Sequence, residues 1–164
     1  MKVLVSDTSV LIDLERGSLL ETSFRLSFEF AVPDLLFKQE LEDYGGQRLI
    51  ELGLRIEELD EEGTKQAINF KREIPSLSTP DSFAFALASK NSWTLLAGDG
   101  ALRKLANTQK VNCHGVLWLM DQMQNESVAT IKELHTGLQA ISSHPNCRLP
   151  RVEINKRLKI YSAS

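Results

Sequence analysis

The sequence predicts an α/β fold in which a central parallel five-stranded sheet lies between two layers of helices, with a helical segment appended at the C-terminus. Short apolar runs of strand length alternate along the chain with longer segments of helical pattern. The run at residues 3–5 is continuously apolar, as strands buried on both faces of a parallel sheet usually are. The 164 residues, 42% of them apolar and 25% charged, suit one domain of this kind.

The composition excludes several classes of protein. It is not that of a collagen-like, mucin-like or wholly disordered chain, and no apolar run approaches the roughly 18 residues that a membrane-spanning helix needs. Asp7 directly follows the first apolar run, which is typical of a strand and not of a secretory signal. Cys113 and Cys147 are too few for a disulfide framework and lack metal-ligand spacing. We therefore expect a cytoplasmic protein with no membrane partner.

In the first part of the chain, the expected elements follow one another closely. The strand at residues 3–5 leads into a helix, and a second strand at residues 28–32 is stopped by Pro33. A proline suits the first turn of a helix, so we expect a helix over residues 33–44, ended by two glycines. Its apolar face is expected to contain Phe37, Leu41 and Tyr44.

The second part continues the alternation of strand and helix. A helix begins near residues 78–81, where either Ser78 caps it with Asp81 three residues on, or Thr79 caps it with Pro80 in first position. The other expected elements are a helix at 47–52, a strand at 54–59, a helix at 64–74, a strand at 93–97, a helix from 102, a strand at 111–113 and a helix at 116–123.

The C-terminal region differs in pattern. Residues 128–141 predict an amphipathic helix, residues 142–146 a linker, and residues 148–159 are basic. We therefore expect a main α/β domain over residues 1–124 and a helical extension with a basic tail over residues 125–164.

The net charge of −3 conceals an asymmetry. Residues 1–62 carry 15 acidic and 6 basic side chains, whereas residues 63–164 carry 7 acidic and 13 basic ones. A polyanion would be repelled by much of the first part and attracted by the second. The simpler interpretation, that both are solvated faces, stays open.

Four acidic residues fall where such a sheet binds ligands. Asp7 follows the first strand and Asp99 follows the fourth, so both lie at the carboxyl edge of the sheet. Asp81 lies in the first turn of the helix that leads into the fourth strand. Glu40 lies within the helix that follows the second strand, on a side that we expect to face inward. We therefore expect these four carboxylates to converge on one site.

Clustered carboxylates repel one another, and a divalent cation removes that repulsion. Oxygen-only ligands favour Mg²⁺ or Mn²⁺. Such a site activates a bound water and stabilises the leaving oxygen of a phosphodiester. The sequence contains no Gly-x-Ser-x-Gly motif, phosphate-binding loop or dinucleotide-binding glycine motif that would indicate another chemistry.

Each acid also has an ordinary structural interpretation. Asp7 suits a helix N-cap, and Asp81 gains from the helix dipole without any metal. Asp99, between two glycines, suits a turn, and Glu40 suits a solvent-exposed helix surface. These interpretations stay open one by one, but all four would have to coincide to replace a shared site.

Short motifs around these acids resemble those of the PIN-domain family. They are residues 6–9 (SDTS), residues 32–33 (VP) leading to Glu40, residues 77–81 (LSTPD) before an alanine-rich helix, and residues 95–99 (LLAGD). The resemblance covers residues 1–123 and implies a Rossmann-like sandwich with a metal-dependent ribonuclease site. Residues 115–117 are similar to the end of a less studied PIN branch.

The resemblance also implies roles for individual residues. Asp7, Glu40, Asp81 and Asp99 match the acidic quartet of the family, with Thr8 and Ser9 supporting the first acid. Many bacterial and archaeal members resemble VapC toxins, which a partner antitoxin holds inactive. The implied partners are RNA, an antitoxin and a second copy of the chain.

Basic residues near the acids are candidates for contacts with substrate phosphates. They are Lys38, Lys90, Arg103 and Lys104. Their alternative is simple solvation. We interpret His114 as a satisfied or exposed histidine, and we interpret Trp93 and Trp118 as core or interface residues and not as base-stacking platforms.

Two function hypotheses follow from the sequence. The first is a metal-dependent endoribonuclease that hydrolyses phosphodiester bonds in single-stranded RNA, because splayed strands reach a recessed site more easily than a duplex. The second is a non-catalytic PIN-like binding module that acts through its C-terminal helix and basic tail, because an apolar helix face needs a cover. Cleavage of structured DNA is a third use of the same acids.

Overall fold

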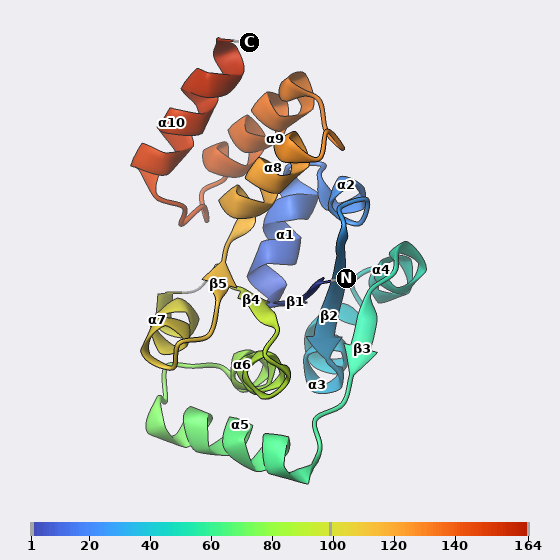
Figure 1. Cartoon of the computed structure of the whole chain (residues 1–164), viewed down its shortest axis with the longest axis vertical. Helices are drawn as coiled ribbons and strands as arrows, with labels where there is room; N and C mark the ends of the chain where they lie inside the picture. Colours follow the sequence, from blue (N-terminus) through green and yellow to red (C-terminus); the bar gives the residue numbers. More distant parts are fainter. Residues whose placement is uncertain (1, 99, 164) are drawn as a thin grey trace.

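The computed structural model describes residues 2–98 and 100–163 and contains a five-stranded sheet in the order β3-β2-β1-β4-β5 (Figure 1). Every paired neighbour in the sheet is parallel. The strands are β1 (Lys2–Ser6), β2 (Phe28–Pro33), β3 (Arg55–Glu57), β4 (Thr94–Leu96) and β5 (Cys113–His114). The predicted α/β fold with a parallel five-stranded sheet is therefore confirmed, although the fifth strand begins two residues later than expected.

Helices cover both faces of the sheet (Figure 1). They are α1 (Thr8–Arg16), α2 (Leu20–Ser23), α3 (Asp34–Leu36), the π-helical turn η1 (Phe37–Leu41), α4 (Gly46–Leu52), α5 (Glu61–Glu73), α6 (Thr79–Asn91), α7 (Gly100–Thr108), α8 (Val116–Asn125), α9 (Ile131–Ser143) and α10 (Arg151–Ser162). On one side α6 packs against β1, β2 and β4, with α5 beyond it. On the other side lie α1 and α8, with α9 and α10 beyond them (Figure 1). Within the described chain, no helix is long and apolar enough to cross a membrane.

Side-chain caps set where several helices begin. The Ser78 hydroxyl accepts from the amide of Asp81 at 3.1 Å, so Ser78 and not Thr79 caps α6. Asp60 caps α5 by accepting from the amide of Gly63 at 2.8 Å, which starts that helix earlier than the pattern predicts. Each such cap satisfies an amide that the first turn leaves unpaired.

The helix predicted over residues 33–44 is wrong in its second half. After α3 the chain enters η1, where the amide of Glu42 donates to the carbonyl of Phe37 at 2.8 Å, and the helix ends at Leu41. A π-helical turn shifts the phase of the side chains that follow it. Phe37 and Leu41 are buried as expected, but Tyr44 is 80% exposed.

The C-terminal extension packs on the α1–α8 side of the sheet through an apolar face. Leu134, Leu138 and Ile141 of α9 are fully buried, and Ile154 and Tyr161 of α10 are also buried. These side chains belong to the same contiguous core as the strands. The apolar face predicted for this region is therefore covered by the chain itself.

The helices of the extension differ from those expected. The predicted helix over residues 128–141 begins at Ile131, because Thr130 and Glu133 form a reciprocal capping box. The region that the sequence identifies only as a basic tail contains α10. A Cβ atom on Gly137 would lie 2.8 Å from the carbonyl oxygen of Gly17, so the close approach of α9 to the end of α1 requires a glycine.

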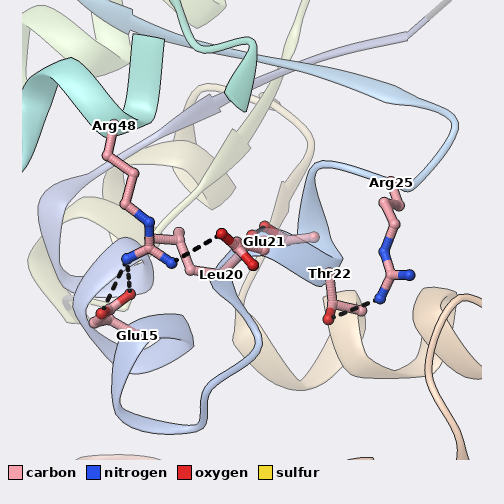
Figure 2. A network of polar contacts seen from close by, with 7 residues as sticks. Glu15, Leu20, Glu21, Thr22, Arg25 and Arg48 are labelled. Atoms are coloured by element: carbon pink, nitrogen blue, oxygen red, sulfur yellow. Dashed lines mark hydrogen bonds and ion pairs between the residues drawn. The ribbon is translucent and has the colours of Figure 1, made fainter. Parts of the chain in front are cut away.

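An exposed network joins α4 to α1 and α2 (Figure 2). Arg48 lies 3.3 Å from Glu15 and 3.4 Å from Glu21, and Arg25 donates to Thr22 at 3.3 Å. Exposed ion pairs contribute at most about 1 kcal/mol each. This network therefore orients α4 on the surface, while the buried core holds the fold.

Candidate active site

Asp7 directly follows β1 and caps α1. Its Oδ1 accepts from the amide of Val10, and its Oδ2 accepts from the hydroxyl of Ser9 and the amide of Gly98, each at 2.9 Å. The residue is 1% exposed. Three donors compensate for the burial of a charge and fix the orientation of the carboxylate. Asp7 is thus an N-cap and, at the same time, a rigidly held carboxylate.

Asp7 lies where the strand order of the sheet reverses. From β1 the chain builds β2 and β3 on one side, and then β4 and β5 on the other. The amide of Asp7 donates to the carbonyl of Leu96, at the end of β4, at 2.9 Å. Ligands of open parallel sheets bind at such a crevice, beyond the carboxyl ends of the strands. The turn after β4 lies close to α1, because a Cβ atom on Gly98 would lie 2.6 Å from the hydroxyl oxygen of Ser9.

Glu40 reaches the same crevice from the π-helical turn η1. Its Oε1 accepts from the hydroxyl of Thr8 at 2.6 Å, which ties η1 to the first residue of α1. Thr8 and Glu40 are both half-buried. π-Helical turns are frequent at functional sites, where the additional residue re-aims a side chain.

Asp81 lies in the first turn of α6, beside its capping residue Ser78. It is half-buried. The dipole of α6 favours a carboxylate at this position, as its structural interpretation states. The same position also directs Asp81 to the edge where β1 and β4 end.

Three of the four predicted acids line one cleft of about 520 Å³, which we call the acid cleft. Asp7, Glu40 and Asp81 come from three separate segments, and Thr8 and Ser9 lie between them. The fourth, Asp99, lies outside the described residues. The rest of the lining comes from Ile12, Asp13, Arg16, Ser78, Gly98, Asn146, Arg148 and Leu149.

The acid cleft is electrostatically negative on the α1 side. Burial raises the pKa of Asp13 above its usual value, and the charge of Asp7 adds to that increase. Arg16 and His144 oppose it, and Arg16 lies 3.8 Å from Asp13. Among the described lining residues, four acids (Asp7, Asp13, Glu40 and Asp81) outnumber two arginines (Arg16 and Arg148).

The donor set suits a hard divalent cation. Asp7, Glu40 and Asp81 offer only oxygen ligands, as Mg²⁺ and Mn²⁺ prefer. Among residues 2–98 and 100–163, no group of three His, Cys, Asp or Glu residues is arranged to hold a metal ion by protein ligands alone. Because Mg²⁺ usually keeps several waters and takes few protein carboxylates, the residues present fit a largely hydrated ion.

The predicted phosphate-binding cations are scattered. Arg103 lines a neighbouring cleft, and Lys104 is exposed beside it on α7. Lys38 lines a different depression, between η1 and the residues that follow β3, and so lies apart from the acid cleft. Lys90 forms an ion pair with Asp60.

Sequence reasoning missed the contribution of the α9–α10 linker. Asn146, Arg148 and Leu149 form part of the acid cleft although they are distant from the acids in sequence. The basic composition of this region was a visible signal. Only the packing of α9 and α10 on the domain, however, determines which basic residue reaches the cleft.

Comparison with known proteins agrees with this architecture. A search of curated proteins found no significant match. The model of the DUF3368 family, described as a PIN domain, matches residues 3–163, which is nearly the whole chain and includes the C-terminal extension. PIN domains are generally nucleases that use divalent metal ions, so the match indicates a nuclease-type role. Together with the parallel sheet and the acids at its edge, it confirms the resemblance seen in the sequence, and the chain belongs to the PIN-domain family.

Proposed function

We propose that this protein is a metal-dependent endoribonuclease that hydrolyses phosphodiester bonds in single-stranded RNA. The observation that carries the proposal is the convergence of Asp7, Glu40 and Asp81 on one cleft at the sheet edge of a PIN domain. Residues 1–124 would carry the catalytic site, and residues 125–164 would form the extension. Single-stranded RNA is the proposed substrate, because a splayed strand reaches a recessed site more easily than a stacked duplex.

The four acids would share one role, and hydrogen bonds fix the orientation of Asp7 and Glu40. Asp7, Glu40, Asp81 and Asp99 would hold Mg²⁺ or Mn²⁺, which when bound supplies positive charge and an activated water. Asp7 is positioned by Ser9 and Gly98, and Glu40 is positioned by Thr8. These contacts keep the carboxylates oriented before the substrate arrives, so that little reorganisation is needed during the reaction.

The cellular setting is part of the proposal. We infer that the protein acts in the cytoplasm as the toxin of a toxin–antitoxin pair, with an antitoxin and a second copy of the chain as partners. Family membership supports the nuclease role, and the toxin role extends it.

A non-catalytic binding module is the second candidate function, but one of the two observations that favoured it no longer applies. The apolar face of α9 was the reason to expect a bound partner, but Leu134, Leu138 and Ile141 are buried within the domain. The exposed basic residues of α10 are what remains in its favour. A folded protein that binds RNA but no metal would favour this module over the enzyme.

The deciding experiment is a nuclease assay on a pool of single-stranded RNAs with Mn²⁺ or Mg²⁺, beside an EDTA control. Asp7→Asn is expected to abolish cleavage, because it removes a charge while an asparagine still caps α1. The matched control is Asp43→Asn, at an exposed position outside the acid cleft. Circular dichroism and thermal melting verify that both variants fold. Metal-dependent cleavage that survives in folded Asp7→Asn would overturn the proposal.

A further inference from the structure

A second cleft, of about 480 Å³, opens beside the acid cleft. Asp13, Gly98, Arg148 and Leu149 line both of them. The two clefts are therefore adjacent across a wall built from α1, the turn after β4 and the α9–α10 linker. A strand bound in the acid cleft would therefore have its neighbouring nucleotides close to the second cleft.

Two arginines of the second cleft are not neutralised by carboxylates of the described chain. Arg148 is exposed, and no ion pair joins it to the described residues. Arg103 is also exposed, and its one described bond is a long one, 3.4 Å, to the carbonyl of Ala97. By contrast, Arg157 lies 2.7 Å from Asp121 and 3.2 Å from Glu153. Arg148 and Arg103 are thus available to an anionic ligand, whereas Arg157 is held in ion pairs.

The carboxylates on the same lining are already balanced. Glu153 is paired with Arg157, and Asp13 lies 3.8 Å from Arg16. A phosphate entering the second cleft would therefore meet the charges of Arg103 and Arg148 without an opposing unpaired carboxylate among the described lining residues.

An aromatic pair also lines this cleft. The rings of His114 and Trp118 are stacked, with centroids 4.1 Å apart and an angle of 7° between their planes. Both are half-buried and line the cleft, and Trp118 also packs against Phe28, with ring centroids 5.5 Å apart. Burial lowers the pKa of His114, and Lys2 and Arg103 lower it further. This shift favours the neutral form of the imidazole.

We propose that the second cleft is a nucleotide subsite of the RNA-binding surface, in which Arg103 and Arg148 hold a phosphate next to the scissile one and the His114–Trp118 pair contacts its base. This inference rests on the proposed ribonuclease function and deepens it. Single-stranded RNA is recognised by this combination of backbone cations and flat side chains. The α9–α10 linker thereby becomes part of the substrate site.

The test measures RNA binding in the full chain carrying Asp7→Asn, which prevents turnover. The probe is a fluorescein-labelled single-stranded oligouridylate of about 12 nucleotides, within the usual range of site sizes. Fluorescence anisotropy over a salt series gives the affinity and its salt dependence. Arg148→Ala is expected to weaken binding roughly tenfold and to lower the slope of log K against log salt by about 0.7, the value for one phosphate contact on a single strand.

Two further variants distinguish binding at the subsite from non-specific attraction of RNA to positive charge. Arg151→Ala removes an equally exposed arginine at the start of α10, outside both clefts, and is expected to change affinity by less than about twofold. His114→Ala is expected to weaken binding roughly tenfold without changing the salt slope, because stacking involves no counterion release. Equal effects of Arg148→Ala and Arg151→Ala would overturn the subsite, as would a complete lack of RNA binding.

Steady-state RNA cleavage with Mn²⁺ separates this inference from the proposed function. It is measured for the wild-type chain and for Arg148→Ala, both with Asp7 intact. A chain that binds RNA through Arg148 but never cuts it would contradict the hydrolysis and leave the subsite standing. If the wild type and Arg148→Ala both cut RNA with the same KM, the subsite would be contradicted and the proposed hydrolysis would stand.

Discussion

The acid cleft and the core of the C-terminal extension are stabilised in different ways. Around the acids, directional hydrogen bonds fix the polar atoms: Asp7 accepts three from the described residues, and Glu40 accepts one from Thr8 at 2.6 Å. In the extension, Leu138 and Ile141 are buried apolar side chains, and even the buried hydroxyl of Tyr161 has no hydrogen-bond partner among residues 2–98 and 100–163. The first region is organised to position charge and the second to hold the domain together, so the same kind of substitution should have different consequences in each.

The largest expected effect is on the acid side. Glu40→Gln keeps the size of the side chain and an oxygen for the Thr8 hydroxyl, but it removes a charge that would balance the cation. We expect kcat/KM for RNA cleavage to fall by at least about 100-fold, with unfolding free energy little changed. Glu42→Gln, two residues on and exposed, is the control and should retain activity. Equal losses in the two variants would remove Glu40 from the site.

The reverse behaviour is expected of the extension. Ile141→Ala opens a cavity where α9 packs against the end of α1, and it should lower the free energy of unfolding by about 2–5 kcal/mol. Urea denaturation measures this change, and activity per folded molecule should stay near that of the wild type. Val152→Ala, at a residue 76% exposed, should change stability by less than about 0.5 kcal/mol. An Ile141→Ala protein of unchanged stability would contradict the role given to the extension.

The same contrast explains what could be predicted from the sequence. Asp7 could be placed because a carboxylate directly after an apolar strand must lie at the sheet edge, whatever the tertiary details. Ser78 lies three residues before Asp81, which is the spacing of a helix cap, so the start of α6 could also be predicted. Local rules were sufficient in these cases.

Other features depend on contacts that no local rule describes. Nothing in the pattern around Glu40 distinguishes a π-helical turn from an α-helix, so Tyr44 was assigned to the wrong face. The turns of α10 lack a clear apolar period, because only Ile154 and Tyr161 are buried in it. Arg148 could not be singled out from its basic neighbours, because the packing of two helices determines its place.

A smaller effect is expected from the hydrogen bond that orients Glu40. Thr8→Val keeps the shape of the side chain and removes the hydroxyl that donates to Glu40. Groups that orient a metal-binding side chain typically contribute about 10-fold to 100-fold in metal affinity or activity, and we expect the lower end because Thr8 is half-buried and water can substitute. Calorimetry of Mn²⁺ binding is the measurement, and Thr8→Ser should restore most of the loss. An unaffected Mn²⁺ affinity in Thr8→Val would mean that Glu40 needs no such support.

The smallest expected effect is at the buried hydroxyl of the extension. Among the described residues Tyr161 has no hydrogen-bond partner for that atom, so Tyr161→Phe removes a desolvated polar group and leaves the ring in place. At neutral pH we expect the free energy of unfolding to rise, or to change by less than about 0.5 kcal/mol. A loss of several kcal/mol would instead show that the hydroxyl is bound, and would add a directional polar contact to the buried core of the extension.

Raising the pH should amplify this difference. Burial raises the pKa of Tyr161 from 10.0 to about 12, with Asp121 adding to the shift and Arg157 opposing it. Between these two values the unfolded chain loses the phenolic proton before the folded chain does, so wild-type stability declines as the pH rises through the window. Tyr161→Phe lacks that proton, and urea denaturation across the window should show the variant gaining on the wild type. Tyr44→Phe should show no such gain, because that side chain is 80% exposed and its hydroxyl meets water in both states.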